Sequence, residues 1–571
     1  MSIEELYELW KKKASADPDI IEELKAIEGN QEEISDRFYK SLAFGTGGLR
    51  GVIGAGTNRM NVYTVNQATQ GLADYLNDRY DAPSVAIAYD SRIKSDVFAK
   101  GAAGVLAANG IKVYIYPTLV PTPMLSFAVR KLKCSSGIII TASHNPSKYN
   151  GYKCYDENGY QMTDEAAEKT LSYISKTDIF DSVKAIDFEQ GIKDAKIEYI
   201  PAAVNEAFFA DVLSQLNDKE LCEKTDLSII YTPLNGTGNI PVRTVLERAG
   251  FKNVRVVSSQ EKPDGTFPTC PFPNPEIRQA FEQALNMAEN EPADLLVATD
   301  PDCDRVGIAV FDDGEYKLLT GNETGVLLIR YLLEVKKETG RLPENPLAVK
   351  SFVTTGLVDA VAASFGVKVI NTLTGFKYIG EIVTQLEKEG QAERFVIGME
   401  ESYGYLVGTH ARDKDAVVSS LMICEMAAYY KARGKNLYRV MQDIYAEYGI
   451  YRNVLLNFSF EGASGMQKMS AMMDSLRENA PQSFGSLGVE YISDFRSSVE
   501  TETATGKTSK IELPSSNVLE YRLEKGNRVI VRPSGTEPKI KIYITAIAPD
   551  EAAADALAEK IGADMKKYMG I

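Results

Sequence analysis

The sequence predicts an α/β protein with three α/β units that share one cleft and a smaller α+β domain at the C-terminal end. Three short, continuous apolar runs, at residues 137–140, 293–299 and 394–399, each pass directly into a polar loop. Runs of this kind are expected of strands whose two faces are both covered by helices. In such sheets ligands bind at the carboxyl ends of the strands, where all three loops fall.

Helical patterns surround the apolar runs, and this alternation indicates α/β architecture. They lie at residues 65–80, 99–109, 277–289 and 416–433. From about residue 451 the pattern changes to strand-like segments at 454–458, 528–532 and 539–544, with helices at 464–477 and 551–568. The period-two alternation of the later strands is typical of antiparallel sheets with one wet face. We therefore expect four domains, at residues 1–197, 198–319, 320–450 and 451–571.

The composition is that of a globular protein with several domains, since the chain has 571 residues of which 44% are hydrophobic. A net charge of −16 argues against a nucleic-acid partner, whose binding depends on clustered cations. The six cysteines show no metal-binding spacing, and no apolar run approaches the ~18 residues that span a bilayer. The acidic N-terminus lacks the apolar core of a signal peptide. We therefore expect a cytoplasmic protein with no membrane partner, and the oligomeric state stays open.

Residues 141–146, Thr-Ala-Ser-His-Asn-Pro, present a candidate nucleophile. An apolar run delivers Ser143 into a short polar turn, which is how a fold exposes a reactive side chain on a rigid strand end. A Ser-His hydrolase is one alternative. However, neighbours in extended backbone point to opposite faces, so we expect His144 to be poorly placed as the base for Ser143. There is also no Gly-x-Ser-x-Gly elbow, while a capping role for the serine stays open.

Asp300, Asp302 and Asp304 follow the second apolar run at every other position. In extended backbone this spacing projects three carboxylates towards one side. Because carboxylates so close repel one another, a divalent cation is the economical explanation, and oxygen ligands favour Mg²⁺. An EF-hand is excluded, since Arg305 and Phe311 stand where that loop needs Gly and Glu. A solvated acidic turn is the remaining alternative.

Three further loops have the residues of a sugar-phosphate site. Residues 45–51 are rich in glycine, whose backbone can approach phosphate closely, although a plain turn is as good an interpretation. Residues 532–538 combine a guanidinium, two hydroxyls and a flexible backbone, which suits a phosphate dianion, with a hairpin turn as the alternative. Residues 400–402, Glu-Glu-Ser, suit sugar hydroxyls, with general acid/base work as the alternative.

With these loops together the chain resembles the α-D-phosphohexomutase family. The matching pieces are residues 141–146, 300–305, 400–402 and 532–536, which occur in the family's order and span nearly the whole chain. The resemblance implies four domains around a central cleft: three related mixed α/β-sheet domains and a smaller C-terminal α+β domain. It also implies an intramolecular phosphotransferase whose phosphorylated Ser143 donates to a sugar monophosphate. The bound bisphosphate then reorients and returns its other phosphate to the serine.

The resemblance also implies roles for individual residues. The catalytic set is Ser143, His144, Lys153, Arg50 and Arg305. The Mg²⁺ ligands are Asp300, Asp302, Asp304 and an oxygen on Ser143. The sugar-binding set is Thr374, Gly375, Lys377, Glu400, Ser402, His410 and Lys414, and the phosphate-binding set is Arg532, Ser534, Gly535 and Thr536. The general base stays open among His144, Lys153, Lys377, His410 and Lys414, and a lysine in this role needs a lowered pKa.

The sequence at residues 400–404, Glu-Glu-Ser-Tyr-Gly, resembles that of the glucose-type members of the family. The expected reaction is therefore interconversion of glucose 1-phosphate and glucose 6-phosphate, with glucose 1,6-bisphosphate as intermediate and activator. Phosphopentomutase and phosphomannomutase activities are alternatives, because the Thr-Gly-Phe-Lys loop at residues 374–377 also occurs in the long subgroup that contains phosphopentomutases. A non-catalytic sugar-phosphate-binding protein is the alternative of a different class. The joint presence of the serine, the aspartates and the cations argues against it.

Overall fold

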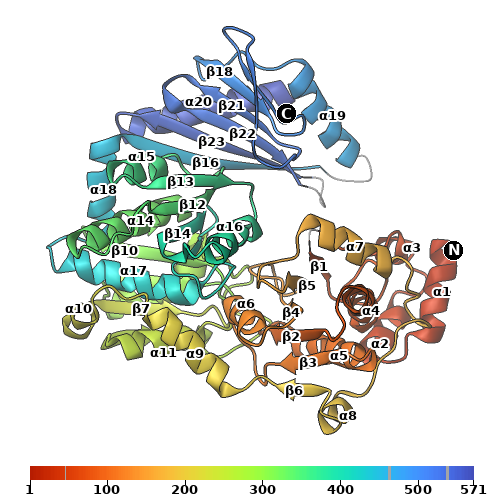
Figure 1. The fold of residues 1–571 in the computed structure, drawn as a ribbon. Coiled ribbons are helices and arrows are strands. Elements are labelled where there is room, and N and C mark those ends of the chain that lie inside the picture. Colours follow the sequence, from red (N-terminus) through yellow and green to blue (C-terminus); the bar gives the residue numbers. More distant parts are fainter. Residues whose placement is uncertain (46, 461–464, 535–538, 571) are drawn as a thin grey trace.

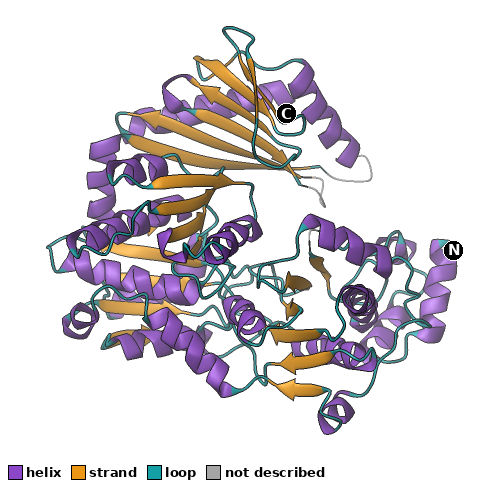
Figure 2. Cartoon of the chain, viewed as in Figure 1, coloured by secondary structure: helices purple, strands orange, loops and turns teal. Residues whose placement is uncertain are grey.

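The computed structural model describes residues 1–45, 47–460, 465–534 and 539–570, which form four β-sheets in chain order. The first domain lies beside the second and third, and the C-terminal domain lies against the third at the far end of a curved arrangement (Figure 1). Helices cover the faces of the first three sheets (Figure 2). None of the described helices has both the length and the apolar character that crossing a membrane requires.

The first domain contains a six-stranded sheet of order β1-β5-β4-β2-β3-β6. Its strands are β1 Gly48–Val52, β2 Ser84–Tyr89, β3 Lys112–Ile115, β4 Ser136–Ile140, β5 Tyr149–Asp156 and β6 Ile197–Tyr199. Its helices are α1 Ile3–Lys13, α2 Pro18–Ala26, α3 Gln31–Phe38, α4 Val62–Arg79, α5 Ser95–Ala108, α6 Thr122–Lys131, α7 Asp164–Ile174 and α8 Phe188–Lys193. The expected boundary after residue 197 falls inside β6, which pairs with β3 and so belongs to the first sheet.

The second domain contains a five-stranded sheet of order β11-β10-β9-β7-β8. Its strands are β7 Ser228–Thr232, β8 Asn253–Val256, β9 Leu295–Thr299, β10 Val306–Asp312 and β11 Glu315–Leu319. Its helices are α9 Ala202–Leu213, α10 Lys219–Lys224, α11 Asn239–Ala249, α12 Ser258–Glu261, the 3₁₀ helix η1 Arg278–Phe281 and α13 Glu282–Asn290. The helix expected at residues 277–289 is thus a 3₁₀ turn followed by an α-helix.

The third domain contains a four-stranded sheet of order β13-β12-β14-β15. Its strands are β12 Leu347–Ser351, β13 Lys368–Thr372, β14 Phe395–Glu400 and β15 Gly404–Leu406. Its helices are α14 Gly321–Glu338, α15 Leu357–Ser364, α16 Phe376–Lys388, the 3₁₀ helix η2 Ala392–Arg394, α17 Ala416–Lys431 and α18 Leu437–Tyr448. Helix α17 is buried along nearly its whole length, because it packs between the second and third domains and shares one hydrophobic core with both.

The first three sheets repeat one plan. Three parallel strands lie side by side, and the strand that follows in the chain pairs with the third of them in antiparallel fashion. The repeated sets are β3-β2-β4 with β5, β8-β7-β9 with β10, and β13-β12-β14 with β15. Strands β4, β9 and β14 are buried at every position, as the continuous apolar runs predict.

The C-terminal domain is different, because its strands pair only in antiparallel fashion among the described residues. Its strands are β16 Ile450–Ser459, β17 Ser483–Phe484, β18 Leu487–Asp494, β19 Val499–Glu502, β20 Thr508–Lys510, β21 Leu519–Leu523, β22 Arg528–Pro533 and β23 Lys539–Ala548. Its helices are α19 Gly465–Glu478, the 3₁₀ helix η3 Glu524–Gly526 and α20 Glu551–Met569. Val529 and Val531 belong to a core shared with α19 and α20, whereas Ile530 packs with Phe352 of the third domain. The predicted fold class is therefore confirmed.

Candidate active site

Three hairpin corners, one in each of the first three domains, carry the loops that the sequence singles out. They are residues 141–148 between β4 and β5, 300–305 between β9 and β10, and 401–403 between β14 and β15. Each contains a residue other than glycine in the left-handed region: Ser143 with φ 52°, Cys303 with φ 52° and Tyr403 with φ 65°. This conformation costs about 1–2 kcal/mol and persists where the surrounding structure enforces it. In the first corner the strained residue is the candidate nucleophile itself.

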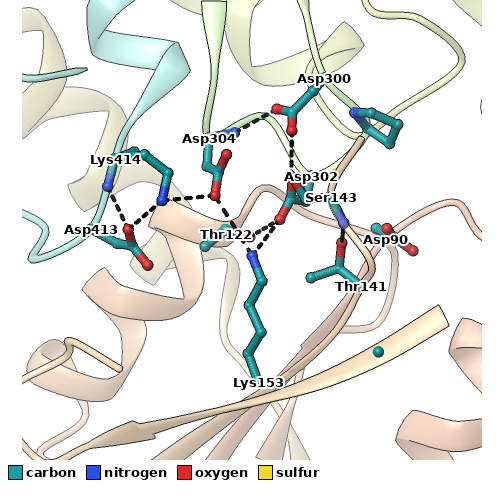
Figure 3. A network of polar contacts seen from close by, with 12 residues as sticks. Asp90, Thr122, Thr141, Ser143, Lys153, Asp300, Asp302, Asp304, Asp413 and Lys414 are labelled. Atoms are coloured by element: carbon teal, nitrogen blue, oxygen red, sulfur yellow. Dashed lines mark hydrogen bonds and ion pairs between the residues drawn. The ribbon is translucent and has the colours of Figure 1, made fainter. Parts of the chain in front are cut away.

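Ser143 is in direct contact with Asp300 of the second corner (Figure 3). The Ser143 hydroxyl donates to Oδ2 of Asp300 at 2.8 Å. The backbone N–H of Ser143 donates to Oγ1 of Thr141 at 2.9 Å, which fixes the corner. Carboxylate oxygens of Asp300, Asp302 and Asp304 lie within 4.8 Å of one another, and all three residues are buried. The structure therefore brings together the serine loop, residues 141–148, and the aspartate loop, residues 300–305.

The aspartate cluster fits a divalent metal ion. The Oδ1 atoms of Asp302 and Asp304 are buried and have no hydrogen-bond partner among the described residues, although buried acceptors are normally satisfied. Burial, and then the neighbouring Asp302 and Asp304, raise the pKa of Asp300 far above its ordinary value, because carboxylates packed together disfavour one another's ionised forms. A donor set made only of oxygen atoms suits a hard cation.

The aspartates converge by a turn, so the argument from extended backbone was wrong even though the carboxylates do cluster. The backbone N–H groups of Asp304 and Arg305 both donate to Oδ1 of Asp300, at 3.1 and 3.0 Å. The backbone N–H and the hydroxyl of Thr237 also donate to the carbonyl of Pro301, at 2.8 and 2.9 Å. Together with the left-handed Cys303, these bonds fold the chain back on itself.

Two lysines from different domains neutralise the cluster. Nζ of Lys153, on β5, lies 2.9 Å from Oδ2 of Asp302 and 3.6 Å from Oδ2 of Asp304. Nζ of Lys414, from the third domain, lies 3.2 Å from Oδ2 of Asp304 and 3.1 Å from Oδ1 of Asp413. Burial alone would raise the pKa of Asp302. The charge of Lys153 and the hydrogen bonds that Asp302 accepts instead hold this pKa below its ordinary value. These contacts bring three domains to one site.

His144 lies beside Ser143, contrary to the expectation that the two side chains point apart. Nδ1 of His144 is 3.1 Å from Oγ of Ser143. The expectation assumed extended backbone, whereas the left-handed Ser143 turns both side chains to the same side. Burial, followed by the charges of Arg305 and Arg50, lowers the pKa of His144 well below its ordinary value. The imidazole also packs edge-to-face on Phe272 of the second domain, with the ring centroids 5.9 Å apart.

Two arginines of the predicted catalytic set lie close enough to His144 for their charges to lower its pKa. Arg305 pairs with Glu276 and lies 3.8 Å from Oδ1 of Asp304. Arg50 is exposed on β1, whose Gly48 lies so close to β5 that a Cβ there would be 2.1 Å from the carbonyl of Tyr152. Glycine is therefore required at this position, where the predicted phosphate loop at residues 45–51 runs alongside β5.

The two predicted sugar loops are joined to each other. Oε1 of Glu400 accepts a hydrogen bond from the backbone N–H of Gly375 at 2.7 Å, so the end of β14 fixes the turn that contains Thr374. Lys377, the second residue of α16, pairs with Asp164 of α7 at 2.7 Å. This pair links the third domain to the first. Ser402 lies half-buried in the third corner.

His410 makes its contacts away from the aspartate cluster. Its Nε2 lies 2.7 Å from Oδ2 of Asp415, whose carboxylate caps α17, and its ring packs edge-to-face on Phe208. His410 therefore supports the turn that carries Lys414. In the C-terminal domain, Arg532 lies near the end of β22, and Ser534 directly follows that strand. Gly535 and Thr536 lie outside the described residues.

Sequence reasoning missed three residues that organise the site. Thr122, at the start of α6, donates its hydroxyl to Oδ2 of Asp302 at 2.9 Å, and its N–H donates to the Asp302 carbonyl at 2.9 Å. Tyr155 donates to Asp413 at 2.6 Å. Arg92 lies under the serine loop. Arg92 could have been found, because residues 90–92 also follow a buried strand directly. Thr122 gave no such signal.

The family models for phosphoglucomutase/phosphomannomutase match the chain in order. The three alpha/beta/alpha domains match residues 41–180, 206–314 and 320–448, and the C-terminal domain matches residues 497–563. The chain belongs to this family. A phosphoglucomutase of Staphylococcus aureus strain MRSA252 is 36% identical over 562 residues, which cover 97% of this chain and 98% of the relative.

Solved structures of phosphohexomutases share the fold. The open form of the phosphoglucomutase parafusin from Paramecium has a TM-score of 0.68 at 18% identity, with 93% of this chain and 97% of that chain covered. N-acetylphosphoglucosamine mutase of Aspergillus fumigatus, solved with GlcNAc-6P and magnesium, has a TM-score of 0.52 at 14% identity, with 97% and 100% covered. Membership of the phosphoglucomutase/phosphomannomutase family confirms the predicted class of enzyme and excludes the hydrolase alternative.

Proposed function

We propose that this enzyme interconverts glucose 1-phosphate and glucose 6-phosphate through a phosphorylated Ser143 and a glucose 1,6-bisphosphate intermediate. The observation that carries the proposal is the 2.8 Å contact between the Ser143 hydroxyl and the buried three-aspartate cluster. A nucleophile at a strand end, held against a cation site, is what phosphoryl transfer needs, because positioning and charge neutralisation supply most of the catalysis. The identity to relatives named phosphoglucomutase supports glucose as the sugar.

Asp300, Asp302, Asp304 and an oxygen on Ser143 would hold Mg²⁺, which neutralises phosphate charge when bound. The protein's own cations complete this work. Lys153 and Lys414 hold the aspartates in place through ion pairs. Arg305 and Arg50 add positive charge near the serine loop, since both lower the pKa of the neighbouring His144. A chain of net charge −16 thus concentrates its cations where a dianion must bind.

The proposed transfer breaks the bond between phosphorus and Oγ of Ser143 and forms a bond between phosphorus and a sugar hydroxyl oxygen. The hydroxyl proton passes to a general base, for which His144, Lys153, Lys377 and Lys414 are the candidates, and the seryl oxygen takes up a proton as it leaves. Glu400, Ser402, Lys377 and the turn at Thr374 and Gly375 would bind the sugar, while Arg532, Ser534, Gly535 and Thr536 would bind its distal phosphate. For His410 we propose an indirect part, through the turn that carries Lys414.

Intact mass spectrometry tests the proposal. Incubation with glucose 1,6-bisphosphate should leave one phosphoryl group on the wild-type protein and none on Ser143→Ala. A coupled assay should then show turnover of glucose 1-phosphate well above that of mannose 1-phosphate or ribose 1-phosphate. Equal rates on ribose and glucose phosphates would favour the phosphopentomutase alternative, and the absence of any serine-dependent phosphate would favour a non-catalytic binding protein. The six unpaired cysteines support the proposed cytoplasmic location.

A further inference from the structure

Arg92 lies beneath the serine loop, in the segment that joins β2 to α5. Its side chain is completely buried. The guanidinium donates to four carbonyl oxygens, three in the serine loop and one at the first residue of β5: those of Ser143 and Asn145 at 2.5 Å each, and those of Pro146 and Tyr149 at 3.0 Å each. One side chain therefore holds the loop from Ser143 to the start of β5. A planar fork of donors can span these four acceptors, which the single ammonium of a lysine cannot.

Arg92 is itself held from two sides. Its charge is balanced by Asp90, whose Oδ2 lies 3.3 Å from Nε, and Oδ1 of Asp90 accepts from the Arg92 N–H and the Ser95 hydroxyl at 2.9 and 2.8 Å. On its other face the guanidinium lies 5.1 Å from the ring centroid of Phe267, which belongs to the second domain. The loop that carries Phe267 packs tightly here, because a Cβ on Gly265 would be 2.5 Å from the backbone nitrogen of Ile93.

We propose that Arg92 is a positioning residue for phosphoryl transfer: it holds Ser143 in its left-handed conformation and aligns the serine loop with the domain that carries the aspartates. This inference rests on the proposed function. A left-handed serine persists only when its surroundings enforce it, and here the enforcing bonds fall on its own carbonyl and on those of the next residues. The Phe267 contact ties the same guanidinium to the second domain. Arg92 touches no reacting atom and acts through the loop.

The test compares Arg92→Lys with the wild-type enzyme. Lysine keeps the charge opposite Asp90 but cannot bond all four carbonyls. We expect the rate of Ser143 phosphorylation by glucose 1,6-bisphosphate, and kcat with it, to fall about 100-fold, as a misplacement of about 1 Å does in other enzymes. KM should stay close to its wild-type value, because the predicted sugar and phosphate loops are untouched. Arg255→Lys is the matched control: Arg255 also donates to loop carbonyls, those of Glu291 and Pro292, but far from the site.

A folded Arg92→Lys enzyme with wild-type phosphorylation rate would overturn the proposal, and so would a rise in KM at unchanged kcat. If Arg92→Lys does not fold, Phe267→Leu provides the second test, because it removes the ring beneath the guanidinium and leaves no charge unpaired. A fall in kcat at constant KM supports the proposal, whereas kinetics indistinguishable from wild type overturn it. Failure of the proposed function is seen separately, as a wild-type protein that takes up no phosphate on Ser143.

Discussion

Glu401 is a half-buried carboxylic acid at the junction of the third and C-terminal domains, next to the predicted sugar ligands Glu400 and Ser402. It accepts a hydrogen bond from Ser351 at 3.1 Å and faces Lys541 and Tyr543 of β23. Burial, and then the charge of Glu400, raise the pKa of Glu401 to about 7. In an unfolded chain the same group titrates near its ordinary value of 4.5. Protein stability must therefore depend on pH through this residue.

The first prediction concerns Glu401→Gln. Between about pH 4.5 and 7 the folded protein keeps a proton on Glu401 that the unfolded chain has lost, so raising the pH through this window removes about 3 kcal/mol of stability. Glutamine carries no such proton, and the variant should gain stability relative to wild type as the pH rises from 5 to 8. Calorimetric unfolding midpoints measured across this range check the expectation. Parallel midpoint curves for the two proteins would contradict it.

Thr122→Val tests the support of the metal site. Valine keeps the shape of threonine but removes the hydroxyl that donates to Oδ2 of Asp302. Because hydrogen bonds to metal ligands orient them, we expect affinity for the divalent ion to fall by about 10- to 100-fold. Titration of the enzyme with Mg²⁺, followed by calorimetry, measures this directly. Thr69→Val, which removes a hydroxyl bonded to Val65 and Tyr152, is the control and should leave metal affinity unchanged.

At the residue scale, the sequence identified the chemical groups of the site but not their orientations. The spacing of Asp300, Asp302 and Asp304 predicted a cluster of carboxylates, but a turn rather than extended backbone brings them together. The orientation of His144 depends on one backbone dihedral, the positive φ of Ser143, which no residue type in that motif requires. Thr122 lies 180 positions from its partner Asp302. Only the folded chain shows such a pairing.

At the scale of elements, helices α1, α2 and α3 form a unit that the sequence analysis did not resolve. They precede the segment matched by the family and enclose Trp10, which is fully buried. The rings of Phe38, Tyr63 and Phe180 all meet Trp10 edge-to-face. Glu23 of α2 accepts from the backbone N–H of Ala55 at 2.8 Å, and so supports the chain that follows β1. The unit therefore braces the strand that carries Arg50.

Phe38→Ala should loosen this unit. Deleting a buried phenylalanine costs about 3–5 kcal/mol, since the cavity that it leaves fills only in part. Because Trp10 is the only tryptophan in the chain, its fluorescence reports the unit selectively. We expect the fluorescence transition in denaturant to move to lower concentration, ahead of the loss of helical circular dichroism. Phe311→Ala, at a ring that is 40% exposed, is the control, and equal shifts in the two variants would contradict the prediction.

The predictability of each element follows from its burial. Strands β4, β9 and β14 are buried on both faces and therefore appear as continuous apolar runs. Helices α4 and α20 are buried along one side, and their apolar residues therefore recur with the helical period in the sequence. Strands β1 and β15 gave no signal, because β1 is a partly exposed edge strand and β15 has only three residues. Their position is set by pairing with β5 and β14, which is a tertiary effect.

At the scale of the whole molecule, the domains are not equally independent. The first three domains all contribute to one hydrophobic core that includes α17, whereas the C-terminal domain has a core of its own. It meets the third domain through a small apolar cluster and through Arg528. Every second side chain of β22 lies on the same face of the sheet. Arg528, Ile530 and Arg532 therefore share the face that lies against the third domain. Arg528, which bonds the C-terminal domain to the third domain, thus lies on the same face of β22 as the predicted phosphate ligand Arg532.

The last prediction concerns the hydrogen bonds of Arg528 between the C-terminal and third domains. Arg528 donates to the carbonyls of Phe352 and Thr354 in the third domain, at 2.8 and 2.5 Å. Arg528→Gln removes these charge-assisted bonds, and the C-terminal domain should then spend less time in the arrangement that binds substrate. KM should rise by about the factor by which that fraction falls, roughly three- to tenfold, while kcat stays nearly constant. Small-angle X-ray scattering should show a larger radius of gyration. Arg522→Gln is the matched control, because Arg522 lies opposite Arg528 on the neighbouring strand but pairs with Glu500 inside its own domain. A similar rise in KM in both variants would show that general loosening of the sheet, rather than loss of the Arg528 hydrogen bonds, governs substrate binding.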